Sequence, residues 1–164
     1  MLLQLKEVFQ NDGHKLQFDY SLPIQEIELN GDYPFKSPVL LDVTAVNRAG
    51  LVDLIVKAEF EFYTHCDRCY DDVLKYFTFT FNHRLAVDLN DDENDDYIET
   101  PDYQLDLDEL AISDILLELP SKMLCKEDCK GLCHKCGHNL NQSDCSCNKA
   151  NVDPRLEILK QFID

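Results

Sequence analysis

The sequence has no long apolar stretch, little arginine and none of the common catalytic motifs. No window approaches the roughly 18 apolar residues of a membrane span. Lys6 and Glu7 interrupt the amino-terminal apolar segment, so we expect no signal peptide and a cytoplasmic protein. Hydrolase chemistry has no support, because a Ser/His/Asp set, a phosphate-binding loop and a His-Glu-x2-His pattern are all missing. Recognition of DNA bases has little support either, because the chain has only four arginines: Arg48, Arg68, Arg84 and Arg155.

Positive charge is scarce as well, and its distribution is uneven. The formal net charge is −17. Residues 1–118 hold 26 acidic and eight basic side chains, whereas residues 119–164 hold six and seven. An acidic body repels phosphate, so we expect residues 1–118 to prefer a basic protein to a nucleic acid.

The more neutral carboxyl-terminal part could face an RNA backbone. A second interpretation of its lysines is that they only offset the charge of neighbouring thiolates and keep this end soluble. The candidate RNA contacts are Lys122, Lys126, Lys130, Lys135 and Lys149.

The eight cysteines occur in closely spaced pairs. In a reducing compartment, repeated close pairs indicate metal ligands rather than disulfides. The favoured interpretation is two structural zinc ions, with an iron–sulfur cluster and redox-active thiols as alternatives. The candidate ligands form an upstream pair (Cys66, Cys69), a middle pair (Cys125, Cys129), a knuckle pair (Cys133, Cys136) and a terminal pair (Cys145, Cys147).

The spacing suggests how these pairs divide between two metals. Gly137 follows the knuckle pair and permits a tight turn, and the terminal pair has the two-residue period of an extended segment. These two pairs could form one compact site, which leaves the upstream and middle pairs for the other. In an alternative partition, the upstream and knuckle pairs share a metal. Four thiolates leave no position for a substrate, so either partition predicts structural sites. His65, His134 and His138 lie nearby but are not expected to be ligands.

Alternating apolar and polar residues predict an antiparallel sheet. Segments 39–45 and 52–62 alternate and are joined by a glycine-containing connection. The second segment runs into the upstream pair, and residues 73–81 alternate beyond it, which places that pair at the tip of a second hairpin. Residues 16–29 alternate around Pro23 and predict an edge strand broken by the proline. The predicted body is therefore an antiparallel β-sheet or a partly closed barrel.

Helical periodicity predicts one packed helix over residues 108–119, capped by Asp108 and ended by Pro120. Asp153 and Pro154 predict the start of a short terminal helix. The acid-rich run 88–96 predicts a solvated loop. The expected fold class is thus α+β, with an acidic β body over residues 1–118. A Cys-rich, zinc-binding segment over residues 119–164 would be tied to this body through the upstream pair.

The cysteine pattern and its surroundings resemble the YceD-like family, the large ribosomal RNA subunit accumulation proteins. The resemblance spans residues 35–164 and is most specific at the carboxyl-terminal cluster. One departure is His134, where relatives usually have proline. The matching features are Cys66-x2-Cys69 after an apolar strand, the helix ending Leu119-Pro120, the run Cys125-x3-Cys129-Lys-Gly-Leu-Cys133-x2-Cys136-Gly-x-Asn139-Leu-Asn141, Cys145-x-Cys147, and Asp153-Pro-Arg-Leu156.

This resemblance implies a non-catalytic factor that supports accumulation of the large-subunit (23S) ribosomal RNA. With the acidic body, it predicts a basic large-subunit ribosomal protein or a pre-ribosomal particle as partner, with RNA contact through the Cys-rich end and no small-molecule substrate. Two alternatives belong to other classes. One is a thiol-disulfide redox enzyme using a Cys-x2-Cys pair. The other is a zinc-stabilised module that reads DNA.

Overall fold

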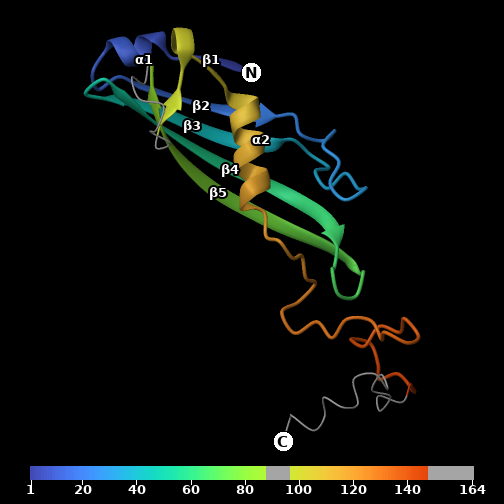
Figure 1. Cartoon of the computed structure of the whole chain (residues 1–164). Helices are drawn as coiled ribbons and strands as arrows, with labels where there is room; N and C mark the ends of the chain where they lie inside the picture. Colours follow the sequence, from blue (N-terminus) through green and yellow to red (C-terminus); the bar gives the residue numbers. More distant parts are fainter. Residues whose placement is uncertain (88–96, 148–164) are drawn as a thin grey trace, which may run out of the picture.

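The computed structural model describes residues 1–87 and 97–147, and within these ranges the fold is built on an open five-stranded sheet (Figure 1). The strand order is β2-β3-β4-β5-β6. Neighbouring strands are antiparallel except for the short β5–β6 pairing, which is parallel. The bounds are β2 Lys15–Leu22, β3 Val39–Arg48, β4 Leu51–His65, β5 Asp72–Ala86 and β6 Ile98–Glu99.

The predicted strand pair is confirmed as the β3–β4 hairpin. Its two-residue connection, Ala49 and Gly50, has φ values of 55° and 90°. Positive φ at both central residues is the type I′ geometry, whose twist matches that of the flanking strands. β4 and β5 each run for 15 residues against ten in β3. Their hairpin therefore extends beyond the rest of the sheet and carries the upstream cysteine pair at its tip, as predicted (Figure 1).

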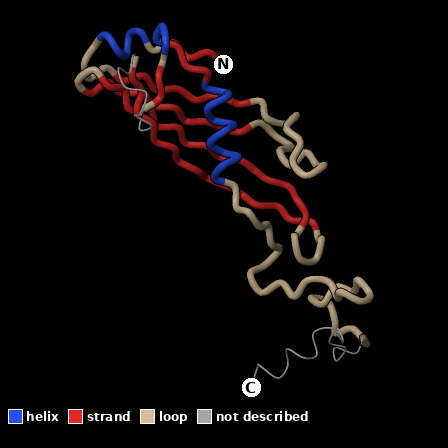
Figure 2. Tube along the Cα trace, in the orientation of Figure 1, coloured by secondary structure: helices blue, strands red, loops and turns tan. Residues whose placement is uncertain are grey.

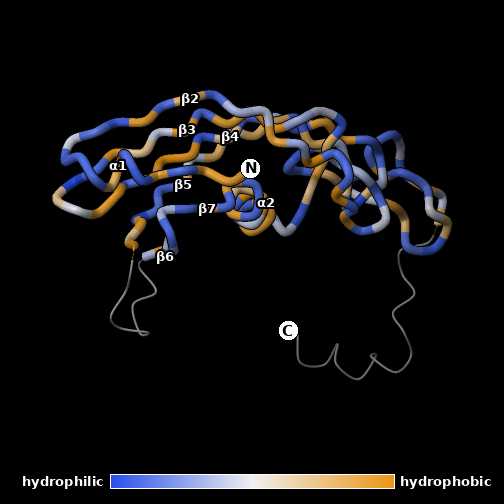
Figure 3. The backbone as a smooth tube through the Cα atoms, turned by 90° about the horizontal axis from the view of Figure 1, so that it is seen from above, coloured by the Kyte–Doolittle hydropathy of each residue, from blue (hydrophilic) through white to orange (hydrophobic). Residues whose placement is uncertain are grey.

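Helix α2 (Leu107–Glu118) covers one face of the sheet (Figures 1 and 3). Its buried residues Leu107, Ala111 and Ile115 pack against the inner face of the sheet. Every second residue of each strand points to this face, because successive side chains of a strand alternate between the two faces. The fully buried strand residues on this inner face include Leu41, Val43, Ala45, Val52, Leu54, Val56 and Ala58. The opposite, outer face mixes polar side chains with exposed apolar ones, among them Leu40, Ile55 and Leu74.

The sheet is open, so the barrel alternative is not formed. Two boundaries also differ from the prediction. Asp106, not Asp108, is the cap of α2, and its carboxylate accepts the backbone N–H groups of Asp108 and Glu109 at 3.0 and 3.3 Å. β2 is an edge strand but ends at Leu22, immediately before Pro23. The alternation beyond the proline does not form a strand, because Ile24 is buried within the connecting loop instead.

A small amino-terminal layer was missing from the sequence-based prediction. β1 (Leu2–Gln4) pairs antiparallel with β7 (Gln104–Asp106), and α1 (Lys6–Gln10) follows it. A 3-10 turn, η1 (Pro101–Tyr103), precedes β7. Each of these elements is too short to leave a clear period in the sequence. The layer is anchored by three buried residues, Leu3, Leu5 and Val8.

Three predictions fall outside the described residues: the acidic loop 88–96, the terminal helix that begins near Asp153, and the RNA contact assigned to Lys149. Within the ranges 1–87 and 97–147, the structure contains no helix long and apolar enough to cross a membrane.

Asn47 joins the amino-terminal layer to the sheet and provides a test of the packing. Its side chain is 2% exposed and donates to the carbonyls of Val8 and Phe9 at 2.8 and 3.0 Å. Asn47→Leu should lower the free energy of unfolding by roughly 1–3 kcal/mol, because it leaves buried carbonyls without a donor. The matched control is Asn82→Leu on the exposed face of β5, where we expect a change within about 0.5 kcal/mol. Equal effects in urea titrations would contradict this account.

Candidate metal centres

The structure gathers the eight thiols into two groups of four. Site 1 consists of the upstream and middle pairs, and site 2 consists of the knuckle and terminal pairs. Within each group all four sulfur atoms lie within 4.8 Å of one another. The structure therefore forms the first of the two partitions considered from the sequence, and it does not form the interleaved one.

The sulfur separations match metal ligands rather than disulfides. In site 1, Cys66 Sγ lies 3.8 Å from Cys129 Sγ, and Cys69 Sγ lies 3.5 Å from Cys125 Sγ. Four sulfurs placed about 2.3 Å from a tetrahedral zinc are separated by about 3.8 Å, whereas a disulfide brings two sulfurs to about 2.0 Å. All eight cysteines are free. Each group could thus hold a metal ion with little rearrangement.

The same backbone turn presents the first two ligands of each site. The N–H of Tyr70 donates to the carbonyl of Cys66 at 2.8 Å, and the N–H of Gly137 donates to that of Cys133 at 2.8 Å. The φ angles of Tyr70 and Gly137 are 62° and 72°. Glycine adopts this left-handed conformation freely, whereas a tyrosine pays on the order of 1 kcal/mol. The ring of Tyr70 stacks on that of His65, with centroids 4.5 Å apart.

Backbone N–H groups favour a thiolate at one cysteine of each turn. Burial raises the pKa of Cys66, but N–H donors from Cys125, Arg68 and Cys69 outweigh it and bring the pKa to about 6. The N–H groups of Cys136 and Lys135 likewise lower the pKa of Cys133 to about 6. A thiolate that accepts N–H donors is already prepared as a metal ligand.

Other thiols in each group resist ionisation while no cation is present. The N–H of Asp71 lowers the pKa of Cys69, but burial and the Asp71 carboxylate together leave that pKa raised. The hydrogen bond with Cys136 raises the pKa of Cys147 to about 12. Four neighbouring thiolates repel one another, and a divalent cation removes that penalty by binding all four. The donor set therefore fits zinc at both sites.

Site 1 fastens the hairpin tip to the segment that follows α2. Asp67 exchanges two hydrogen bonds with the backbone of Met123: its N–H donates to the Met123 carbonyl at 2.9 Å, and its carboxylate accepts the Met123 N–H at 2.6 Å. Arg68 donates from Nη1 to the carbonyl of Cys129 at 2.9 Å. Two stretches more than 50 residues apart in the sequence are thereby joined by polar contacts as well as by the thiols.

Two asparagines connect the two sites, and sequence reasoning did not assign them this role. Asn141 Nδ2 donates to Cys129 Sγ at 3.3 Å, and its Oδ1 accepts the N–H of Lys130 at 2.9 Å. Asn139 Nδ2 contacts both carboxylate oxygens of Asp71 at 3.1 and 3.0 Å. The only sequence signal for these residues was their place in the family motif.

The remaining candidate residues lie around the sites. No histidine belongs to either four-thiol group, and His138 Nε2 contacts Ser143 instead. Four of the five candidate RNA-contacting lysines are exposed in the Cys-rich segment, and the ammonium of Lys126 lies 3.9 Å from Asp128. The exposed four are Lys122, Lys126, Lys130 and Lys135.

The thiol–disulfide alternative finds no support in this geometry. Cys66 and Cys69 are 1% and 3% exposed and lie at the tip of a β-hairpin. A thioredoxin-type pair instead begins a helix and exposes one thiol to its substrate. Sites closed by four sulfurs stabilise structure, since they offer no open coordination position.

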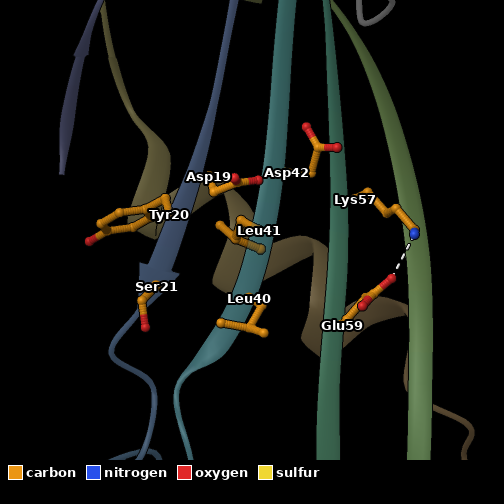
Figure 4. A pocket seen from close by; sticks show the side chains of 8 residues that line it. All are labelled: Asp19, Tyr20, Ser21, Leu40, Leu41, Asp42, Lys57 and Glu59. Carbon is orange, nitrogen blue, oxygen red and sulfur yellow. Dashed lines mark ion pairs between the residues drawn. The ribbon is translucent and has the colours of Figure 1, made fainter.

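The outer face of the sheet provides a second feature, an acidic hollow of about 480 Å³ (Figure 4). Asp19 and Asp42 are direct cross-strand partners there, an arrangement that is unfavourable for two like charges. Among the described residues, Lys57 is the one basic side chain that lines the hollow; it pairs with Glu59 at 2.6 Å and lies opposite Asp42 on the neighbouring strand, so three carboxylates share a single ammonium. This face is suited to contact with a cationic surface.

Comparison with known proteins gives one family and one relative. A family model described as "Large ribosomal RNA subunit accumulation protein YceD" matches residues 54–163. YlbN from Bacillus subtilis (strain 168), described as an uncharacterized protein, is 26% identical over 160 residues, which cover 96% of this chain and 93% of the relative. No solved structure matches the chain. The matched range contains all eight cysteines.

Metal content tests the partition. Purified under reducing conditions, the protein should carry two zinc ions per chain by elemental analysis and native mass spectrometry. Cys129→Ser and Cys145→Ser should each reduce the content to one ion, because they remove a ligand from site 1 and site 2 respectively. The control is Ser146→Ala, which lies between two ligands and should retain two ions. The double variant Cys129→Ser with Cys145→Ser should carry no zinc, because it breaks both sites. One remaining ion would contradict the partition, since the interleaved arrangement places both cysteines in the same site.

Gly131 tests the contact between the sites. Its φ is 74°, and a Cβ at this position would lie 3.0 Å from the carbonyl oxygen of Arg68, which accepts the N–H of Leu132. Gly137 has a similar φ but open space around it. The left-handed backbone lowers the stability of both alanine variants by about 1 kcal/mol. In Gly131→Ala the new Cβ must also displace the carbonyl of Arg68. Zinc should therefore be released at a lower urea concentration from Gly131→Ala than from Gly137→Ala, and equal midpoints would refute the contact.

Proposed function

The chain belongs to the YceD family of large ribosomal RNA subunit accumulation proteins, and on that premise we propose that it is a non-catalytic factor in biogenesis of the large ribosomal subunit. It acts in the cytoplasm by binding a basic large-subunit ribosomal protein or an assembly intermediate. The observation that carries this proposal is the family match over residues 54–163, which includes both groups of thiols. The family description names accumulation of an RNA and no catalysed reaction.

The charge of the body supports a protein partner. Residues 1–118 hold 26 acidic against eight basic side chains, and the outer face concentrates Asp19, Asp42 and Glu59 around one hollow. Such a surface repels phosphate but attracts the lysines and arginines with which ribosomal proteins contact RNA. The acidic body thus shields a basic protein before that protein reaches its RNA site.

The two sites supply rigidity. Zinc bound at site 1 and site 2 by the eight cysteines would hold the Cys-rich segment against the β4–β5 hairpin. This segment has no regular secondary structure over residues 119–147, so metal ligation and the polar contacts described above carry its order. Lys122, Lys126, Lys130 and Lys135 of this segment are exposed, and with Lys149 they form the proposed RNA contact.

Genetic complementation tests the proposal. Cells without the protein should contain less large-subunit ribosomal RNA relative to small-subunit RNA, and the wild-type chain should restore the ratio. The protein should also co-purify with basic large-subunit proteins at low salt and release them at high salt, because the contact is electrostatic. Asp19→Asn with Asp42→Asn should weaken this association, whereas Thr44→Ser on the same face should not.

Two results would refute the proposal. One is an unchanged ratio of the two ribosomal RNAs in the deletion strain. The other is binding of the full chain to bare ribosomal RNA more tightly than to the basic proteins, since an acidic chaperone has the opposite preference.

A further inference from the structure

The outward edge of β5 has no neighbouring strand along most of its length in the described part of the chain. β5 pairs with β4 from Asp72 to Leu85, whereas β6 pairs only with Leu85 and Ala86. Figure 2 shows β5 at the margin of the sheet. About a dozen residues therefore form an open edge, and such an edge can pair with another chain.

The hairpin geometry identifies the backbone groups that point outward. In a two-residue hairpin the closing pair, here Arg48 and Leu51, exchanges hydrogen bonds, and such pairs then alternate along the strands. It follows that the backbone N–H and C=O groups of even-numbered β4 residues point toward β5. The backbone groups of even-numbered β5 residues point away from β4, toward the open edge. An observed contact agrees: the carbonyl of Ala86 accepts the N–H of Thr100 at 2.9 Å on the outward side.

The centre of this edge carries none of the usual protection against pairing, and its nearest basic residues are Lys75 and Arg84 on either side. The run Tyr76-Phe-Thr-Phe-Thr-Phe81 contains no charge, proline or glycine and consists of residues that favour strands. Tyr76 is 71% exposed and Leu74 is 41% exposed. Edge strands of soluble proteins normally carry lysine, proline or a bulge. A run of this kind is an aggregation hazard unless a partner covers it.

The inner and outer faces of the sheet favour different side chains in a strand added at this edge. On the inner face Phe77, Phe79 and Phe81 are only half-buried, and consecutive rings lie 5.3 and 6.0 Å apart between centroids. An added strand would extend this face with apolar side chains. On the outer face Thr78 and Tyr76 lie opposite Glu59 and Glu61. Glu59 already pairs with Lys57, so Glu61 is the stronger attraction for lysine or arginine in the added strand.

Charge decides among the occupants that could cover the edge. A second copy would bring together two chains of net charge −17 each. The acid-rich run 88–96 of this chain would add six carboxylates beside Glu59 and Glu61. Both are opposed by repulsion, whereas a basic segment is attracted.

We propose that the edge of β5 from Leu74 to Asn82 binds an extended segment of a basic protein by β-strand addition, and that this segment alternates apolar with basic side chains. Its apolar side chains continue the phenylalanine face, and its basic side chains reach Glu59 and Glu61. The main chain supplies affinity, and the alternation supplies specificity. This inference rests on the proposed function, because it identifies the surface and the chemistry by which a basic ribosomal partner is held.

A peptide of ten residues alternating lysine and valine, with blocked ends, is a direct probe. It should bind the zinc-loaded full-length chain and slow hydrogen exchange of the Thr78 and Thr80 amides, which point outward. A peptide alternating glutamate and valine should not bind. Reversing the charge with Glu59→Lys and Glu61→Lys should exchange the preference between the two peptides, and this variant leaves the backbone edge unchanged.

Thr78→Pro tests the edge itself. Proline removes an outward N–H and takes no hydrogen bond from β4, so the fold should persist. The variant should bind the lysine–valine peptide at least tenfold more weakly, whereas the control Thr78→Val, which keeps the N–H, should bind as the wild type does. Equal binding by Thr78→Pro would overturn the proposal. So would slow exchange of Thr78 and Thr80 in the free chain, or a dimer that Thr78→Pro dissociates, because the edge would then already be covered.

Association in cells separates this proposal from the function on which it rests. If the wild type and a folded Thr78→Pro variant associate equally with large-subunit precursors, the edge proposal fails and the function stands. If the wild type does not associate with such precursors, the proposed function fails whatever the peptide shows.

Discussion

The gathering of eight thiols at one end of a long β-hairpin is the constraint on which the rest of the structure depends. Each group packs four sulfurs within 4.8 Å, a distance at which four thiolates repel one another unless a cation binds them. Backbone N–H groups stabilise one thiolate in each turn, and Asn139 and Asn141 join the two groups. A segment without regular secondary structure thereby becomes a fixed extension of the sheet.

The sheet is the rigid support to which this extension is attached. β4 and β5 have a well-packed middle, where α2 covers the inner face, and they carry the hairpin tip outward from it (Figure 1). The outer face is acidic over β2, β3 and β4, where Asp19, Asp42 and Glu59 lie, and the run Tyr76–Phe81 gives β5 an uncharged stretch of edge beside half-buried phenylalanines. Acidity and an open strand edge would each be a liability alone. Together they suit an extended basic partner, because the acidic face attracts its charge and the strand edge can pair with its backbone.

Much of this arrangement was predictable from the sequence, because the signals were local. Alternation over residues 39–62 and 73–81 predicted the hairpins, and cysteine spacing predicted two four-thiol groups. What the sequence did not reveal depends on distant contacts or on short elements. The cap at Asp106 lies outside the apolar pattern of the helix, and β1, α1 and β7 are too short to show a period. The choice between the two partitions, the link through Asn139 and Asn141, and the open edge of β5 each require knowing which strands lie side by side.

X-ray absorption at the zinc edge of the purified, reduced protein tests the central claim most directly. The account predicts that both zinc ions have four sulfur neighbours at about 2.3 Å and no nitrogen or oxygen ligand. A first shell containing nitrogen or oxygen at about 2.0–2.1 Å would mean that a site is open or uses histidine. That result, or a folded protein without zinc, would contradict the closed four-thiolate centres described above.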